Sequence, residues 1–336
     1  MPSQAFTAQP SVETPSTANP GPHCRHRRVV SRKKRMEILV EYTTASLTAL
    51  ICAFARALHT RADAQQVLCD PWGDVLVPAV VKTTLRKMAV AKMGRDDETV
   101  IDDWVSSIPF YPGVITRSRY TEDVLASAIC RGVRQYVLVG AGFDSYFLRR
   151  PANSEELVIH EIDHPATQAL KLEQLKNLGM SSPHAVHFLA ADLATEELDA
   201  VLSRSTFVES KPAMFSWLGV SPYLTREANL RTLQTIARSS AAGSELVFTY
   251  HDQVSFQADI ESDNADIAQI ARKVRAQGEP FLSGFYPNEL AQDLKAVGMQ
   301  LVEDLSDAQT VARYDPKGSN KWNPPPIVRI AHARII

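Results

Sequence analysis

The spacing of hydrophobic positions divides the 336-residue chain into two regions. In residues 37–60, large apolar side chains recur every three or four positions, which is the period of an amphipathic helix. Similar patterns occupy residues 80–93 and 122–132, and a DPWG turn at residues 70–73 separates the first pattern from the second. Because no convincing strand occurs among them, the sequence predicts a group of helices that precedes any sheet.

Short apolar runs of strand length begin at residue 136 and alternate with helical stretches. Because strands that alternate with helices form βαβ units, this order predicts a parallel sheet that is covered on both faces. The expected strands are residues 136–139, 157–162, 185–189, 213–218, 245–250, 299–305 and 327–335, and the expected helices are residues 165–178, 226–239 and 287–297. The predicted fold is therefore α/β, with a doubly wound, mostly parallel seven-stranded sheet after an N-terminal helical cap.

The first 35 residues differ from the rest in composition. Residues 1–22 are rich in Pro, Ser, Thr, Ala and Gln and almost lack large apolar side chains, so they cannot bury enough surface to offset the entropy of ordering. Residues 25–35 form the basic run RHRRVVSRKKR, which is typical of a nuclear or mitochondrial address and also of a solvated tail. Because short basic runs are common, we favour the tail and predict that residues 1–35 are disordered.

Composition and charge narrow the class of protein. The chain is 45% hydrophobic and 22% charged, as ordinary globular domains are. Residues 1–35 hold seven basic side chains and one acidic side chain, which leaves the remainder with 29 basic and 37 acidic residues, a net charge of −8. An acidic body argues against a nucleic-acid-binding surface and suits an enzyme that acts on a small molecule.

No metal site, disulfide framework or membrane span is expected from the sequence. The four cysteines, Cys24, Cys52, Cys69 and Cys130, are far apart and form no C-x-x-C pair, which indicates reduced thiols in a cytoplasmic protein. The most apolar early stretch, residues 45–58, contains an arginine and is too short to cross a bilayer. The sequence leaves the oligomeric state open.

The sequence VLVGAGFDSYF at residues 137–147 places two glycines directly after a predicted strand. Glycines let the backbone approach a ligand closely, and the helix that follows offers unpaired N–H groups, so this arrangement is typical of nucleotide sites. Gly140 and Gly142 supply the pattern, whereas Ser145 stands where the dinucleotide fingerprint has its third glycine. A G-x-G loop alone is common, so the prediction of a site depends on other groups near it.

Two acids stand at the ends of the next two predicted strands. Asp163 follows Gly142 by 21 positions, where a carboxylate can accept hydrogen bonds from both hydroxyls of a ribose. Asp192 can accept a hydrogen bond from an adenine amino group, and Leu193 is an apolar neighbour for the ring. Either acid could instead cap the helix that follows its strand. Because parallel strands end at one edge of a sheet, suitable groups at three strand ends favour a nucleotide site.

Seven segments together resemble the leucine carboxyl methyltransferase family, from about residue 44 to the C-terminus. The resemblance is strongest to its bacterial and fungal branch of S-adenosylmethionine-dependent O-methyltransferases, which includes polyketide-tailoring enzymes. The matching segments are DPW at Asp70, TRSRY at Thr116, VLVGAGFDSYFLR at Val137, HEIDHPATQALK at His160, AADL at Ala190, SWLGVSPYLT at Ser216 and GEPFLSGF at Gly278. The resemblance implies a methyltransferase domain at residues 36–336, with a helical cap at residues 36–132 and a Rossmann-like core with substrate-covering insertions at residues 133–336.

The resemblance also implies roles for single residues. Arg117 matches the family arginine that pairs with the methionine carboxylate of the cofactor, a group that a guanidinium can grip with two hydrogen bonds, and Arg119 could share this role. In much of the family a glutamate near the cofactor's amino group stands at the position of Leu218, so that contact must be made differently here. The other matches are Gly140 and Gly142 for the methionine part, Asp163 for the ribose, Asp192 with Leu193 for the adenine, and Tyr223 beside the transferred methyl group.

The predicted activity is the transfer of a methyl group from S-adenosylmethionine to a carboxylate or hydroxyl oxygen of a small molecule, as in secondary metabolism. Because the cofactor is already activated, the protein mainly orients and desolvates the reactants. A carboxylate acceptor needs no base, whereas a phenol, with a pKa of about 10, would benefit from one. His251, after the fifth predicted strand, could take such a proton or could be a solvent-facing strand end. No other base is apparent, which favours a carboxylate acceptor.

Two other functions fit part of the pattern. An NAD(P)-dependent oxidoreductase uses the same kind of sheet, but it would carry a third glycine and a proton relay built on Tyr-Lys or His, and neither is apparent. A non-catalytic, cofactor-binding member of the methyltransferase fold would account for Leu218 in place of the family glutamate. Two assays distinguish the methyltransferase from these two alternatives: whether the protein binds S-adenosylhomocysteine, and whether it transfers a methyl group.

Overall fold

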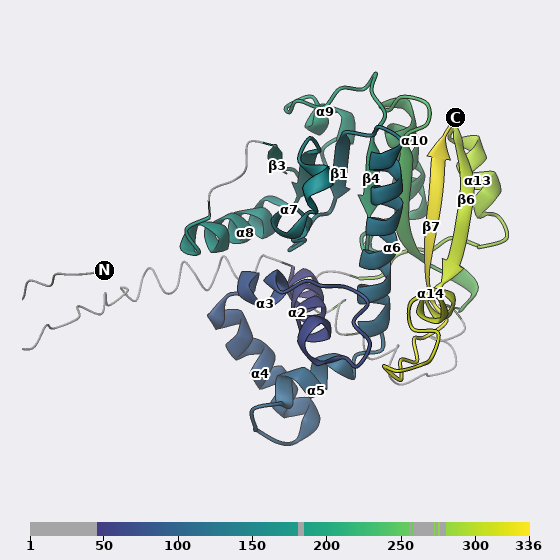
Figure 1. Ribbon diagram of the computed structural model, residues 1–336. Helices are drawn as coiled ribbons and strands as arrows, with labels where there is room; N and C mark the ends of the chain where they lie inside the picture. The colour runs from purple at the N-terminus through teal and green to yellow at the C-terminus, as the bar shows by residue number, and fades with distance from the viewer. Residues whose placement is uncertain (1–45, 181–184, 256, 258–271, 273–274, 276–279) are drawn as a thin grey trace, which may run out of the picture. The chain divides into compact units, whose positions relative to one another are not determined.

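The computed structural model describes residues 46–180, 185–255, 257, 272, 275 and 280–336, all within the unit Val40–Ile336 (Figure 1). The predicted tail, residues 1–35, lies outside the described residues, as do residues 36–45 of the predicted cap. The helices that precede the sheet are α2 (Leu47–Ala62), α3 (Trp72–Leu76), α4 (Ala79–Met93), α5 (Val100–Ser106) and α6 (Tyr111–Cys130). No helix in the described part of the chain is long and apolar enough to span a bilayer.

Helix α6 is longer than the sequence pattern indicated, because it begins at Tyr111 and not at residue 122. The Tyr-Pro-Gly sequence at its start is typical of a turn. Proline is nevertheless compatible with the first turn of a helix, and a Cβ at Gly113 would lie 2.4 Å from Oδ2 of Asp307. Glycine therefore permits close packing against Asp307, and the earlier start places Arg117 on the helix.

The seven strands form one sheet in the order β3-β2-β1-β4-β5-β7-β6, as the alternation of strands and helices predicted. Strands β1 to β5 pair with one another in parallel, and β7 is antiparallel to both β5 and β6. The strands are β1 (Gln135–Val139), β2 (Val158–Asp163), β3 (Val186–Ala190), β4 (Met214–Trp217), β5 (Glu245–His251), β6 (Met299–Ser306) and β7 (Val328–Ile335).

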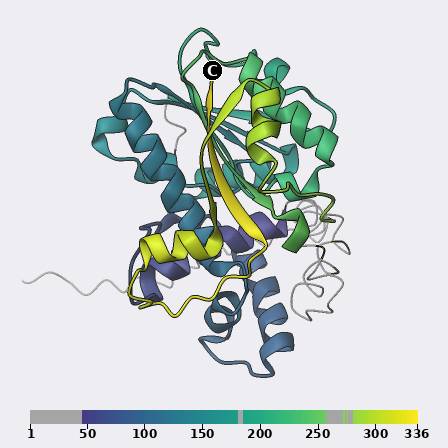
Figure 2. The ribbon, with the colours of Figure 1, turned by 90° about the vertical axis from the view of Figure 1, so that its right-hand side faces the viewer.

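Helices cover both faces of this sheet. In β1, Tyr136 and Leu138 belong to the hydrophobic cluster that includes α2, α6 and α8, whereas Val137 and Val139 belong to the cluster that includes α9, α10 and α13. Figure 2 shows α6 on one side of the strands, with α10 and α13 on the other. The remaining helices are α7 (Tyr146–Arg149), η1 (Ala152–Ser154), α8 (Pro165–Asn177), α9 (Leu198–Leu202), η2 (Ser221–Tyr223), α10 (Arg226–Arg238), α13 (Leu290–Ala296) and α14 (Asp307–Tyr314).

The strand order reverses direction between β1 and β4. From β1 the chain continues outward through β2 and β3, and it then returns to the other side of β1 to form β4 and β5. In open parallel sheets, ligands bind outside the carboxyl ends of the strands at such a switch point. The loop that holds Gly140 and Gly142 follows β1 directly, so the fold places it at this position.

A buried ion pair connects the helical region to that loop. Nε of Arg56 on α2 donates to Oδ2 of Asp70 over 2.8 Å, and its Nη2 donates to the carbonyl oxygen of Phe143 over 2.7 Å. Burial disfavours the charge of Asp70, but the nearby guanidinium groups of Arg56 and Arg149 outweigh it and hold the pKa of this carboxyl below its usual value. The DPW segment therefore helps to anchor the residue after Gly142.

Candidate active site

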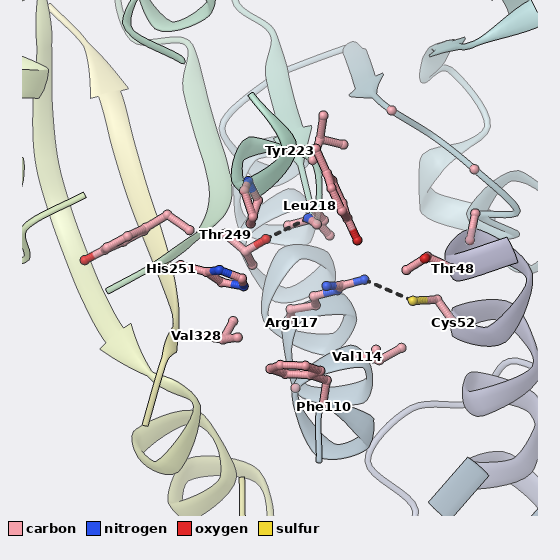
Figure 3. Close-up of a pocket in the computed structure, with 18 of the residues that line it drawn as sticks. Thr48, Cys52, Phe110, Val114, Arg117, Leu218, Tyr223, Thr249, His251 and Val328 are labelled. Atoms are coloured by element: carbon pink, nitrogen blue, oxygen red, sulfur yellow. Dashed lines mark hydrogen bonds between the residues drawn. The ribbon is translucent and has the colours of Figure 1, made fainter. Parts of the chain in front are cut away.

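A cavity of about 310 Å³ lies at the carboxyl ends of the central strands. The loops after β1 and β4 and the ends of β2 and β5 line it, together with residues of α2, α6 and α14 and the start of β7. Figure 3 shows side chains from these elements converging on Arg117. The cavity therefore joins elements that are far apart in the sequence at the switch point of the sheet.

The loop after β1 has a shape that only glycine permits at its first position. Gly140 has a φ of 76°, and a Cβ there would lie 2.4 Å from Cγ2 of Val220. The N–H groups of Gly140 and Ala141 both donate to the carbonyl oxygen of Ile162 over 2.9 Å, which fixes the loop to the end of β2. The backbone at residues 140–142 thus forms one wall of the cavity without side chains that would fill it.

Asp163, at the end of β2, lines the same cavity. One carboxylate oxygen accepts a hydrogen bond from the N–H of Gly142, and the other accepts one from the N–H of His164 over 2.6 Å. Burial raises the pKa of Asp163, and these backbone hydrogen bonds oppose that rise. The carboxylate is held beside the glycine loop, where it could accept hydrogen bonds from ribose hydroxyls.

Arg117 is half-buried on α6 and lines the cavity. Its Nη2 lies 3.5 Å from Sγ of Cys52, and a Cβ on Gly219 would lie 2.9 Å from its Nη1. Arg117 forms no ion pair with any residue of the described ranges, so its charge is available for an anion. Arg119 lines no part of this cavity; its exposed side chain pairs with Asp123 over 2.9 Å.

A smaller cavity of about 80 Å³ lies beside the first and shares Arg117, Gly140 and Gly142 with it. Leu218 lines both cavities, so the position of the family glutamate does face the site. The carboxyl-bearing Asp144 and the hydroxyl-bearing Ser216 also line the smaller cavity. Polar groups are therefore present near Leu218 even though leucine itself cannot bind an amino group.

Asp192 and Leu193 stand beyond the end of β3, but neither lines the cavity that contains Asp163. Oδ1 of Asp192 accepts a hydrogen bond from the N–H of Ala194 over 3.0 Å in a local turn, and it does not cap a helix, because α9 begins only at Leu198. Leu193 lines a separate cavity of about 80 Å³ next to α10. The predicted role of this pair at an adenine ring stays a prediction.

The other part of the main cavity is aromatic. The ring of His251 stacks on that of Phe110 at 6.4 Å and meets that of Phe281 edge-on at 4.8 Å, and Tyr223 lies 5.4 Å from Phe281. Figure 3 shows the hydroxyl of Tyr223 pointing toward Arg117. His251 is only 4% exposed and burial lowers its pKa to about 4, so the interpretation of it as a solvent-facing residue is wrong.

The sequence pattern did not single out Asp307, which the structure brings into this cavity. Asp307 is the first residue of α14 and only 3% exposed, and its Oδ2 has no hydrogen-bond partner in the described part of the chain. A capping box between Ser306 and Gln309 marks the start of this helix and could have been found in the sequence. The contact of Asp307 with Gly113 of α6, which lies 194 positions earlier in the chain, could not be found in the sequence.

Comparison with known proteins agrees with this arrangement. The leucine carboxyl methyltransferase family matches residues 49–237. YktD of Bacillus subtilis, itself assigned as an S-adenosylmethionine-dependent methyltransferase, is 33% identical over 273 residues, which cover 78% of this chain and 88% of YktD. A protein of Mycolicibacterium gilvum with the same assignment is 33% identical over 208 residues, which cover 61% of this chain and 66% of that protein.

The solved structure of a DUF574 family protein from Streptomyces avermitilis is also similar, with a TM-score of 0.49 and 17% identity over 75% of this chain and 97% of that chain. The family match and the relationship to YktD define the class as an S-adenosylmethionine-dependent methyltransferase. The chain belongs to the leucine carboxyl methyltransferase family.

Proposed function

We propose that this methyltransferase transfers the methyl group to an oxygen of a small molecule, as enzymes of secondary metabolism do. The observation that carries the proposal is the cavity of about 310 Å³, which extends from the glycine loop and Asp163 to the aromatic residues around His251. One end suits the cofactor, and the other end offers a space lined mainly by aromatic and apolar side chains. Such a space fits a small organic acceptor better than a peptide or a nucleic acid.

The residues present fit S-adenosylmethionine. The two glycines of the loop leave room for the methionine part of the cofactor, and the carboxylate of Asp163, held by backbone N–H groups, matches the ribose. Arg117, which has no ion-pair partner in the described ranges, matches the carboxylate of the cofactor. When bound, the cofactor supplies a methyl group that its sulfonium has already activated. The proposed contacts are Arg117 with the carboxylate, Gly140 and Gly142 with the methionine part, Asp163 with the ribose, and Asp192 with Leu193 at the adenine.

Tyr223 and His251 are proposed to contact the acceptor where the methyl group is transferred. Both line the cavity, and together with Phe110 and Phe281 they can hold a planar acceptor in place and exclude water. Orientation and desolvation of this kind are the main contributions that a protein makes to a methyl transfer. His251 is neutral at physiological pH because its pKa is lowered to about 4, so it can accept a hydrogen bond.

The proposed function is tested with purified protein, methyl-labelled S-adenosylmethionine and a panel of mono- and bicyclic phenols and carboxylic acids. Label in an extractable product with a new bond to oxygen supports the proposal. Thermal shift with S-adenosylhomocysteine and with NADH is measured alongside, and stabilisation by NADH alone would point to an oxidoreductase. Binding of S-adenosylhomocysteine without transfer to any acceptor would instead support a non-catalytic member of the fold.

Replacing Asp163 tests the cofactor end of the cavity. Asp163→Ala removes the carboxylate beside the glycine loop and should weaken S-adenosylhomocysteine binding by about 1–3 kcal/mol, the range for a hydroxyl that loses its partner. Asp163→Asn can still accept the hydrogen bond from Gly142 and should lose less affinity. Isothermal titration measures both. Equal affinity of wild type and Asp163→Ala would mean that the ribose is bound elsewhere.

A further inference from the structure

We propose that Asp307 contacts the methyl acceptor and takes the proton of its hydroxyl group, and that the acceptor is therefore a phenol or a similarly acidic hydroxyl compound. This inference rests on the proposed transfer to oxygen and narrows its substrate class. It reverses the preference for a carboxylate that the sequence suggested, because that preference depended on the apparent lack of a base.

The position of Asp307 is built into the packing of two helices. A Cβ at Gly113 would lie 2.4 Å from Oδ2 of Asp307, so the carboxyl group fits against α6 only because residue 113 is glycine. The hydroxyl of Thr310, one turn along α14, donates to Oγ1 of Thr116 on α6 over 3.1 Å. Asp307 lines the same cavity as Tyr223 and His251. A buried carboxyl group is thereby held at the acceptor part of the site.

Within the described residues, one oxygen of this carboxyl group lacks the hydrogen-bond partner that a buried acid normally has. Oδ2 accepts no hydrogen bond within the described ranges, whereas buried polar atoms are usually paired. Arg117 is the only lysine or arginine among the described residues that line the cavity. Its positive charge acts on Asp307 from a distance, but the two side chains form no ion pair. An unpaired carboxyl group at a cavity wall is suited to bind a ligand that donates a hydrogen bond.

The other charged groups on the elements around α14 are already paired. Glu303 on β6 binds Arg313 of α14 over 2.7 Å and accepts from the hydroxyl of Tyr120 on α6. Asp304, also on β6, binds Arg329 of β7 over 2.7 Å and accepts from the hydroxyl of Tyr250 on β5. His251 of β5 lines the cavity in its neutral form. Arg117 is thus the charged side chain in this region that forms no ion pair among the described residues and can bind a charged ligand.

Charge balance favours a neutral acceptor. The proposed function assigns Arg117 to the carboxylate of the cofactor, so a carboxylate acceptor would find no other arginine or lysine among the described lining residues and would lie near a second acid. Two neighbouring carboxylates in a buried site repel each other, and one of them must take up a proton. A hydroxyl group avoids this cost, because it donates a hydrogen bond to the ionised form of Asp307.

The basicity of Asp307 also suits this task. Burial raises its pKa to about 7, although the charge of Arg117 opposes the rise. A base with a pKa near the working pH is the most effective in proton transfer. His251, with its pKa lowered to about 4, is the weaker base of the two. We therefore assign proton acceptance to Asp307 and hydrogen bonding to His251.

The step conserves atoms and electrons. The acceptor's O–H bond breaks, and its proton goes to a carboxylate oxygen of Asp307. The hydroxyl oxygen forms a new bond to the methyl carbon, the electron pair of the carbon–sulfur bond stays on sulfur, and no oxidant or reductant is needed. Asp307 then returns the proton to solvent when the product leaves.

The test compares acceptors that share one ring and differ in the accepting group, such as 2-naphthol and 2-naphthoic acid, within a wider panel of such pairs. Wild type should methylate the hydroxyl members, with kcat/KM rising with pH through about 7 as Asp307 ionises. Asp307→Asn should lower kcat for hydroxyl acceptors at least tenfold, abolish this rise and improve the relative use of the carboxylates. Its affinity for S-adenosylhomocysteine should stay within twofold of wild type.

Glu303→Gln is the control, because this acid borders α14 but does not line the cavity, and it should leave the acceptor preference and the pH profile unchanged. A wild-type preference for the carboxylates, or an Asp307→Asn variant with unchanged kcat and pH profile, would overturn the inference and leave transfer to oxygen intact. Loss of S-adenosylhomocysteine binding in Asp307→Asn would overturn it by assigning Asp307 to the cofactor. Binding of S-adenosylhomocysteine by wild type without transfer to any oxygen acceptor would overturn the proposed function itself.

Discussion

Arg117→Ala is expected to weaken the binding of S-adenosylhomocysteine about 100-fold, a loss of about 3 kcal/mol. The guanidinium lies in the cavity beside Cys52 and has no ion-pair partner in the described ranges, so its charge is free to bind the carboxylate of the ligand. Charge-assisted hydrogen bonds to a carboxylate are among the strongest that a site can offer. Isothermal titration of wild type and variant gives the difference directly.

Arg119→Ala is the matched control for this prediction. Arg119 lies two positions away on the same helix, but its side chain is 46% exposed and pairs with Asp123. An exposed pair of this kind contributes little to binding or stability, so the affinity should stay within twofold of wild type. A large loss in Arg119→Ala and none in Arg117→Ala would show that the assignment of the TRSRY arginines is reversed.

Asp70→Ala is expected to lower the free energy of unfolding by about 3–5 kcal/mol, the range for removal of one partner from a buried ion pair. The variant would leave Arg56, which is 6% exposed, with an uncompensated charge. It would also remove the acceptor for the N–H groups of Trp72 and Gly73 at the start of α3. Chemical denaturation measures the loss.

Asp74→Ala provides the comparison, because Asp74 lies four positions after Asp70, on α3, and pairs with Lys82 at the surface. Its removal should change the free energy of unfolding by no more than about 0.5 kcal/mol. Since Arg56 also holds the carbonyl oxygen of Phe143 next to the glycine loop, Asp70→Ala should weaken S-adenosylhomocysteine binding as well. Equal stability of the two variants would contradict the structural role of the DPW segment.

The arrangement of the sheet could be predicted from the sequence because its central strands, β1, β4 and β5, are buried on both faces. Such strands appear as short apolar runs, and each of the seven expected runs corresponds to a strand with nearly the same ends. The start of α6 was missed because Pro112 and Gly113 resemble a turn. Helix α14 was missed because it is only eight residues long and carries only two large apolar side chains, Val311 and Tyr314.

The sequence could predict which residues lie together at the cavity where they are close to one another in the chain. Gly140, Gly142 and Asp163 follow neighbouring strands, so their spacing alone placed them together. Arg117 could be proposed for the cofactor only through the family resemblance, since nothing local in the sequence distinguishes it from Arg119. Asp307 could not be proposed from the sequence at all, because only its contact with α6 and the lack of a partner for Oδ2 among the described residues single it out.

The product of the reaction tests the central claim most directly. Purified protein is incubated with S-adenosylmethionine that carries a trideuteromethyl group and with the panel of phenols and carboxylic acids, and the product is analysed by mass spectrometry before and after mild alkaline hydrolysis. We predict a product that keeps its trideuteromethyl group after hydrolysis, as an aryl methyl ether does. Release of the label as methanol would identify a methyl ester and contradict the role of Asp307, and a label on nitrogen or carbon would contradict transfer to oxygen.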